Sequence, residues 1–188
     1  MTSIVLPLAD GVEEMEAVIV VDVLRRASWQ VTTAAIGDSP LVTASRGVVL
    51  KADRLWQDNM ATGHGTETID GIVIPGGAGG AQALCRHEGV LECLRACDRN
   101  GRLIGAICAG PLVLQASGIL HGRRYTCYPG VQDGITGAHH CNEKTVRDNR
   151  LITSQGPGTA FDFALALIEA VDGAAKAAAI RRQLVLFA

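Results

Sequence analysis

A chain of 188 residues, 48% hydrophobic and 19% charged, has the length and composition of one folded domain and not of a disordered segment. Its formal net charge of -2 and its aromatic content of 4% argue against nucleic acid and anionic membrane surfaces as partners. The N-terminus lacks the positively charged region of a signal peptide. We therefore expect a cytoplasmic protein, with no nucleic-acid or membrane partner, whose six cysteines are free thiols.

The first half of the chain is predicted to contain two strands that flank a helix. Apolar runs at residues 3–8 and 29–36 predict the strands, and apolar residues at helical spacing between Val12 and Ala27 predict an amphipathic helix between them. Residues 41–51 predict a hairpin, and residues 53–67 are polar and irregular.

The second half continues the alternation of strands and helices. We expect strands at residues 69–74, 103–107, 123–126 and 151–153, one or two helices over 81–100, and further helices over 109–117, 157–171 and 174–182. Strands that are apolar on both faces and alternate with helices are typical of an α/β fold, in which helices cover both sides of a parallel sheet. The chain shows no internal repeat or linker, so we expect a single domain.

Cys108 follows a predicted strand and precedes Pro111, a residue favoured in the first turn of a helix. A cysteine at such a turn lies beside free N–H groups and the positive end of the helix dipole, which stabilise a thiolate and lower its pKa. The small neighbours Ala106, Ala109 and Gly110 leave room for a tight turn and a substrate. Cys108 is either a nucleophile or a buried core cysteine, and spacing alone does not distinguish the two.

Glu16 lies on the apolar face of the first predicted helix, four residues after Val12 and four before Val20. A carboxyl group among apolar side chains is costly unless it is neutral or paired, so burial should raise its pKa. A protonated Glu16 could donate a hydrogen bond to a cysteine sulfur. The alternative, a first-turn glutamate that only serves the helix dipole, explains Glu13 and Glu14 better than Glu16.

A glycine-rich turn at residues 75–80 follows the predicted strand 69–74. Its glycine spacing fits neither a phosphate loop nor a dinucleotide-binding fingerprint. It is either an oxyanion hole shared with the N–H of Ala109 or a flexible turn. The histidines and cysteines lack the paired spacing of a zinc site, so we expect no metal and no cofactor.

Five segments stand in order along the chain: GVEEME (11–16), IPGG (74–77), AICAGP (106–111), TSQGPGT (153–159) and QLVL (183–186). Together they resemble the ThiJ/PfpI superfamily, in the branch that holds the Parkinson's-disease protein deglycase (DJ-one) and bacterial YajL. The resemblance implies a single class I glutamine amidotransferase-like domain over residues 1–188. It further implies a flavodoxin-like three-layer α/β/α sandwich with a mostly parallel sheet, usually as a homodimer.

The resemblance also assigns roles to residues. It implies that Cys108 is the reactive cysteine and Glu16 its protonated partner. The backbone groups that match the oxyanion region are those of Gly76, Gly77 and Ala109.

Three further positions are implied near the site. Arg26 and Arg46 match arginines that lie near the site or the dimer contact in relatives. Tyr128 stands where some relatives carry a histidine before the proline, here Pro129. That departure argues against a Cys–His dyad, and no other histidine is assignable as a base.

The residues and the resemblance together predict a cofactor-free glyoxalase or deglycase. In this hypothesis the Cys108 thiolate attacks methylglyoxal, glyoxal or their adducts on amines and thiols, while Glu16 moves the proton. The alternative is a redox sensor or chaperone in which Cys108 oxidises to a sulfinate that Glu16 caps. Thiazole-phosphate biosynthesis and peptidase activity are less favoured.

Overall fold

The computed structural model describes residues 1–56 and 69–186. Its main sheet contains β1 (Ser3–Leu8), β2 (Gln30–Ala35), β5 (Arg54–Leu55), β6 (Gly71–Ile74), β7 (Leu103–Ile107), β10 (Thr145–Asp148) and β11 (Leu151–Ser154). The strands lie in the order β10-β11-β7-β6-β1-β2-β5, and every neighbouring pair is parallel except β10 with β11. This arrangement confirms the mostly parallel α/β fold that the sequence predicts.

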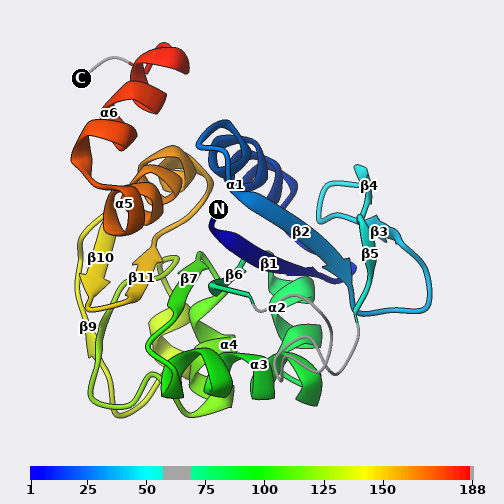
Figure 1. The fold of residues 1–188 in the computed structure, drawn as a ribbon. Coiled ribbons are helices and arrows are strands. Elements are labelled where there is room, and N and C mark those ends of the chain that lie inside the picture. Colours follow the sequence, from blue (N-terminus) through cyan, green and yellow to red (C-terminus); the bar gives the residue numbers. More distant parts are fainter. Residues whose placement is uncertain (57–68, 187–188) are drawn as a thin grey trace.

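Helices cover both faces of the sheet (Figure 1). One face carries α1 (Glu14–Arg26) and α5 (Ala160–Asp172), with α6 (Ala174–Gln183) packed on α5. The other carries α2 (Ala78–Leu84), α3 (Glu88–Arg99) and α4 (Pro111–Ser117). Each face has its own apolar core, with Val20 and Phe163 fully buried in one and Leu94 and Leu114 in the other. Among the described residues, no helix is both long and apolar enough to cross a membrane.

Several elements differ from the sequence prediction. The sequence gives no sign of β10, whose residues TVRD are largely polar, because an edge strand with one exposed face lacks an apolar run. The helix expected over 157–171 is split, since Pro157–Thr159 form a 3₁₀ turn and α5 begins at Ala160. Of the polar stretch 53–67, residues 57–67 lie outside the described part of the chain.

Two small ladders complete the fold. The predicted hairpin consists of β3 (Leu41–Thr43) and β4 (Val49–Lys51), which pair antiparallel. A second ladder joins β8 (Arg124–Tyr125) to β9 (His139–His140) in parallel.

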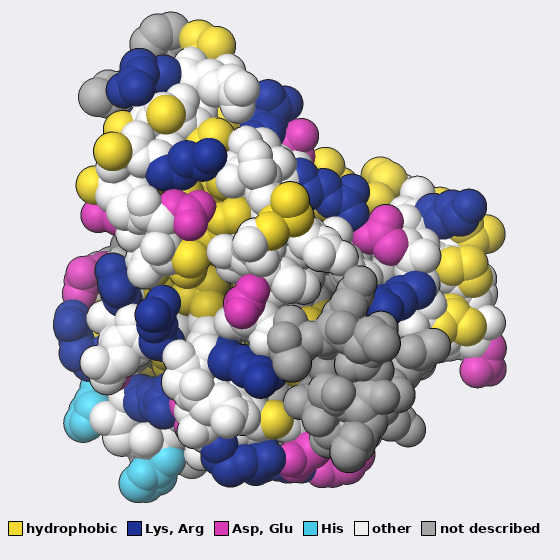
Figure 2. Space-filling view, in the orientation of Figure 1, with side chains coloured by type: hydrophobic (Ala, Val, Ile, Leu, Met, Phe, Trp, Pro, Cys, Tyr) yellow, Lys and Arg dark blue, Asp and Glu magenta, His cyan; other side chains and the backbone are white. Residues whose placement is uncertain are grey.

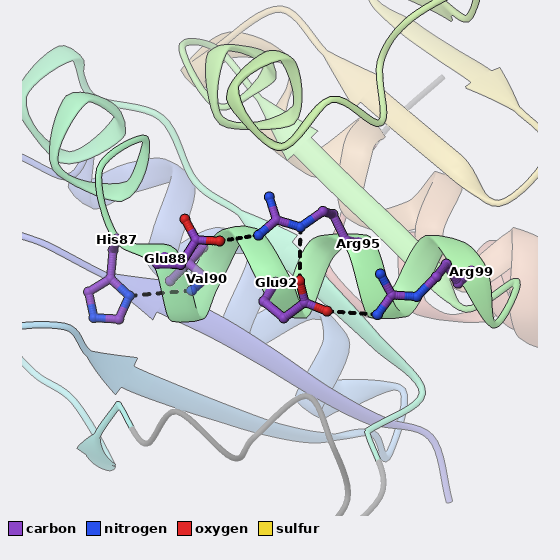
Figure 3. A network of polar contacts seen from close by, with 6 residues as sticks. All are labelled: His87, Glu88, Val90, Glu92, Arg95 and Arg99. Atoms are coloured by element: carbon purple, nitrogen blue, oxygen red, sulfur yellow. Dashed lines mark hydrogen bonds and ion pairs between the residues drawn. The ribbon is translucent and has the colours of Figure 1, made fainter.

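The outer face of α3 carries a network of ion pairs (Figure 3). Arg95 contacts both Glu88 and Glu92, and Arg99 Nη2 lies 2.7 Å from Glu92 Oε1. His87 caps the helix by accepting the N–H of Val90 at its Nδ1, 3.3 Å away. Exposed ion pairs contribute little to stability, so α3 is held mainly by its buried face.

The strand order also fixes where a site can form. From β1 the chain moves outward to β2 and β5, and it then returns to the other side of β1 as β6. The carboxyl ends of β1, β6 and β7 therefore lie side by side at the point where the strand order reverses, the usual location of sites in open α/β sheets.

Candidate active site

Cys108 lies directly after β7 in a strained turn. Its φ of 63° is in the left-handed region, which is unfavourable for a residue with a side chain. Its N–H donates to the carbonyl oxygen of Ser154 and its carbonyl accepts the N–H of Tyr128, both at 3.0 Å. These two hydrogen bonds hold the turn, and the side chain remains only 9% exposed.

Glu16 is fully buried in the first turn of α1 and faces this cysteine. Its Oε2 accepts the N–H of Gly76 at 2.8 Å, and the Cys108 side chain lies beside its carboxyl group. Its Oε1 is buried without a hydrogen-bond partner among the described residues. Burial raises the pKa of Glu16 from 4.5 to about 7, because a carboxylate loses its hydration there.

Gly76 allows the two side chains to meet. A Cβ atom at Gly76 would lie 2.4 Å from Cys108 Cβ, 2.5 Å from Glu16 Oε2 and 2.9 Å from Cys108 Sγ. Any other residue at this position would displace the pair. The N–H of Gly76 is already bonded to Glu16, so it is not free to serve the oxyanion hole in which the sequence prediction placed it.

The thiol of Cys108 is subject to opposing effects. Burial and the neighbouring charge of Glu16 raise its pKa, whereas the N–H groups of Gly77 and Ala109 lower it. The pKa is raised to about 12, which contradicts the lowered pKa predicted from a helix N-terminus alone. The turn sequence reveals the nearby N–H groups, whereas the depth of burial follows only from the assembled fold. Near neutral pH, Glu16 and Cys108 can therefore carry only one negative charge between them.

A cavity of about 600 Å³ opens above Cys108. Tyr128 and Arg46 line it, as do Met15, Val131 and Pro157. No histidine lines it among the described residues, and the same part of the chain contains no group of three or more potential metal ligands.

Arg26, the other arginine that the resemblance brings near the site or the dimer contact, does not line this cavity. Its Nε pairs with Asp22 Oδ2 at 2.6 Å on the outer side of α1.

Glu14 has a role that the sequence did not reveal. It is largely buried, and its two carboxylate oxygens accept the Ser45 hydroxyl and the Arg46 N–H, each at 2.9 Å. Burial alone would raise the pKa of Glu14, but its own backbone N–H, the Ser45 hydroxyl and Arg46 together lower it. Glu14 thus fixes the tip of the hairpin as a wall of the cavity. Its position in the first turn of α1 suggested only a dipole contact, because the hairpin is distant in sequence.

The site thus combines a cysteine in the turn after a parallel strand with a buried carboxyl group. The DJ-1/PfpI family matches residues 2–170, and the chain belongs to that family. This confirms the resemblance stated from the sequence motifs.

Individual relatives cover the chain over nearly its full length. It is 42% identical over 184 residues to the Parkinson disease protein 7 homolog of Danio rerio, which covers 95% of this chain and 94% of that protein. It is 38% identical over 185 residues to the glutathione-independent glyoxalase DJR-1.2 of Caenorhabditis elegans, with 97% and 95% covered. It is also 42% identical over 174 residues to protein DJ-1 homolog B of Arabidopsis thaliana, which covers 92% of this chain but only 39% of that protein. The crystal structure of Drosophila melanogaster DJ-1beta matches with a TM-score of 0.91 at 36% identity, covering 100% of this chain and 99% of that one.

Replacing Gly76 by alanine should abolish the reactivity of Cys108. The new Cβ would occupy the space in which Sγ and Glu16 Oε2 meet, so both side chains must move. Mass spectrometry of the Cys108 peptide after brief iodoacetamide treatment measures the effect. Gly37→Ala is the matched control, because a Cβ there meets nothing within 4 Å. Equal alkylation of Cys108 in both variants would contradict the close packing described above.

Replacing Glu16 by glutamine should change how stability depends on pH. The pKa of Glu16 is about 7 when folded and 4.5 in its ordinary state, so only the folded chain holds this proton between those values. The proton on Glu16 stabilises the folded chain fully at pH values below 4.5, and this stabilisation is lost as pH rises through about 7. In wild type the free energy of unfolding should therefore fall by about 3 kcal/mol.

Urea unfolding of wild type and Glu16→Gln at a series of pH values measures this difference. The free energy of unfolding of Glu16→Gln, relative to wild type, should rise by about 3 kcal/mol from pH about 4.5 to about 7.5. The exposed Glu169→Gln is the control and should run parallel to wild type within about 0.5 kcal/mol. If Glu16→Gln also runs parallel to wild type, the raised pKa is wrong.

Proposed function

We propose that the protein is a cysteine-dependent, cofactor-free glyoxalase that converts methylglyoxal to lactate and acts in the same way on glyoxal and on dicarbonyl adducts of amines or thiols. The observation that carries this proposal is the buried Glu16–Cys108 pair, which shares one charge beneath an open cavity. The name of the Caenorhabditis elegans relative, a glutathione-independent glyoxalase, supports the reaction class.

The two pKa values place the single charge of the pair mainly on Glu16, and the reactive form is the one in which the Cys108 proton has moved to the Glu16 carboxyl group and left the negative charge on Sγ. Oε1 is the oxygen suited to hold that proton, because Oε2 already accepts the N–H of Gly76. The thiolate adds to the aldehyde carbon of methylglyoxal and forms a C–S bond. The N–H groups of Gly77 and Ala109 stabilise the resulting alkoxide, and the Glu16 carboxyl protonates it to a hemithioacetal.

The second half of the reaction moves one proton between carbon atoms. The Glu16 carboxylate removes the proton from the former aldehyde carbon, and the enediol accepts a proton at the neighbouring carbon, which leaves a lactoyl thioester on Cys108. Water then hydrolyses the thioester to lactate and the free thiol. The overall change is the addition of one water molecule, so the reaction needs no oxidant, reductant or cofactor.

Tyr128 supports this assignment of the proton transfer to Glu16. It lines the cavity at the position where a histidine would supply a second base. A phenol is a poor base near neutral pH, whereas a carboxyl group whose pKa is about 7 can both give and take a proton.

Lactate formation from methylglyoxal tests the proposal directly. We expect turnover by wild type and only background rates in Cys108→Ser. Glu16→Gln should keep Cys108 open to alkylation but lose turnover, because an amide cannot shuttle the proton. Wild-type turnover should rise with pH through about 7, as the pair loses its first proton, and no histidine should add a second inflection.

The redox role is the competing outcome of the same experiment. It requires Cys108 to oxidise to a sulfinate under peroxide while wild type forms no lactate. That pair of results would contradict the glyoxalase proposal.

We also propose that the protein is a homodimer. The outer face of α1 exposes Met15 and Val18, and the hairpin exposes Val48 and Val49, each about half accessible. Figure 2 shows hydrophobic side chains gathered over this hairpin. Large apolar side chains exposed on both elements favour contact with a second copy. Light scattering at micromolar concentration should give twice the mass of one chain, and Val18→Asp should shift it toward the monomer. A monomer in wild type would remove this proposal.

A further inference from the structure

The segment TSQGPGT (153–159) takes no part in the chemistry above, yet it lies against both backbone bonds that hold Cys108. The carbonyl of Ser154 accepts the N–H of Cys108, and the carbonyl of Cys108 accepts the N–H of Tyr128, each at 3.0 Å. Hydrogen bonds therefore hold the Cys108 turn to two supports, the end of β11 and the segment 126–128. The geometry of the turn depends on how firmly the rest of the structure holds these two supports.

Ser154 is the first support, and its side chain is fully buried. Its Oγ donates to the carbonyl of Lys144 at 2.7 Å and lies 2.7 Å from Thr159 Oγ1 and 3.1 Å from Thr145 Oγ1. Because these partners belong to the start of β10 and to the 3₁₀ turn before α5, the hydroxyl ties the end of β11 to both. The carbonyl that receives the Cys108 N–H is thereby fixed in position.

Thr153 fixes the second support. It is fully buried, and its Oγ1 accepts the N–H of Thr126 at 2.9 Å. This bond holds the segment 126–128 against β11 and so locates the N–H that Tyr128 donates to Cys108. Since consecutive residues of a strand point to opposite faces, Thr153 and Ser154 act on the Cys108 turn from the two sides of the sheet.

The same cluster shapes the wall beside Glu16. Thr159 Oγ1 accepts the N–H of Gly156 at 3.1 Å and lies 2.9 Å from its carbonyl oxygen. A Cβ atom at Gly156 would lie 3.1 Å from the ring of Tyr128 and 4.0 Å from Glu16 Oε1. Thr159 therefore holds Gly156 close to Tyr128 and Glu16, while Ser154 holds the Cys108 turn.

We propose that Thr153 and Ser154 are positioning residues whose hydroxyl groups clamp the Cys108 turn. A left-handed cysteine persists only where its surroundings over-determine it, and these two hydroxyls supply that constraint. The clamp keeps Sγ beside the N–H groups of Gly77 and Ala109, where its thiolate is stabilised. Without it the turn relaxes, Sγ moves away from those N–H groups, and the thiolate forms less readily.

Ser154→Ala and Thr153→Val test the clamp, because each removes a hydroxyl with little change in shape. Ser117→Ala is the matched control, since Ser117 is also buried and its Oγ donates to the carbonyl of Leu114 at 2.8 Å, on α4. Alkylation of the Cys108 peptide is followed against pH by mass spectrometry, together with the melting temperature. We expect the two clamp variants to react roughly tenfold more slowly at fixed pH, as a thiol pKa raised by about one unit predicts. Ser117→Ala should lower the melting temperature without slowing the alkylation of Cys108.

The proposal is overturned if both clamp variants alkylate within about twofold of wild type while their melting temperatures fall as in Ser117→Ala. If Ser154→Ala does not fold, Thr159→Val removes one of its partners and Thr159→Ser restores the hydroxyl. Slow alkylation in Thr159→Val with recovery in Thr159→Ser supports the clamp, and unchanged alkylation in Thr159→Val overturns it.

The clamp deepens the proposed function because it acts on the same thiol. Its readout is alkylation and requires no turnover. A wild-type protein that forms no lactate would therefore refute the glyoxalase proposal and leave the clamp standing. Unchanged alkylation of Cys108 in the clamp variants would refute the clamp and leave the glyoxalase proposal standing.

Discussion

One negative charge shared by two buried groups is the constraint on which the site depends. Glu16 is fully buried and Cys108 nearly so, and their side chains meet at a glycine where a Cβ atom would not fit. If both side chains were ionised, the two neighbouring negative charges would repel strongly in this buried environment of low polarity. The pair must therefore keep one proton near neutral pH, and that retained proton is available for chemistry.

The fold brings the parts of this pair together from distant segments. Glu16 comes from the helix after β1, Gly76 from the turn after β6, and Cys108 from the turn after β7. These three strands are neighbours in the sheet, so their carboxyl ends deliver the three residues to one point. The other two contributions come from β11, the neighbour of β7, and from the separate two-stranded hairpin. The end of β11 holds the Cys108 turn, and the hairpin tip, fixed by Glu14, forms a wall of the cavity.

The sequence predicts best the features that a local pattern encodes. Apolar runs locate the parallel strands, helical spacing puts Glu16 on a buried face, and small residues mark the turn at Cys108. Features that depend on contacts between distant segments are not visible in this way. The bonds of Glu14 to residues 45–46 and the occupied N–H of Gly76 each join residues more than thirty positions apart. The thiol pKa was misjudged for the same reason, because burial is a property of the assembled fold.

The burial that raises the pKa of Glu16 also destabilises the folded chain when Glu16 is ionised. An exposed glutamate with a pKa near 4.5 would be ionised at neutral pH and could not donate a proton there. Burial raises that pKa to about 7, which allows one group to serve as acid and base in a site whose lining includes a tyrosine where a histidine could stand. The same shift destabilises the folded chain by about 3 kcal/mol once Glu16 ionises, a large share of the roughly 5–15 kcal/mol that stabilises a typical domain. A carboxyl group that destabilises the fold in this way, opposite a cysteine held in a strained conformation, supports the proposed proton transfer at that cysteine over a role in packing alone.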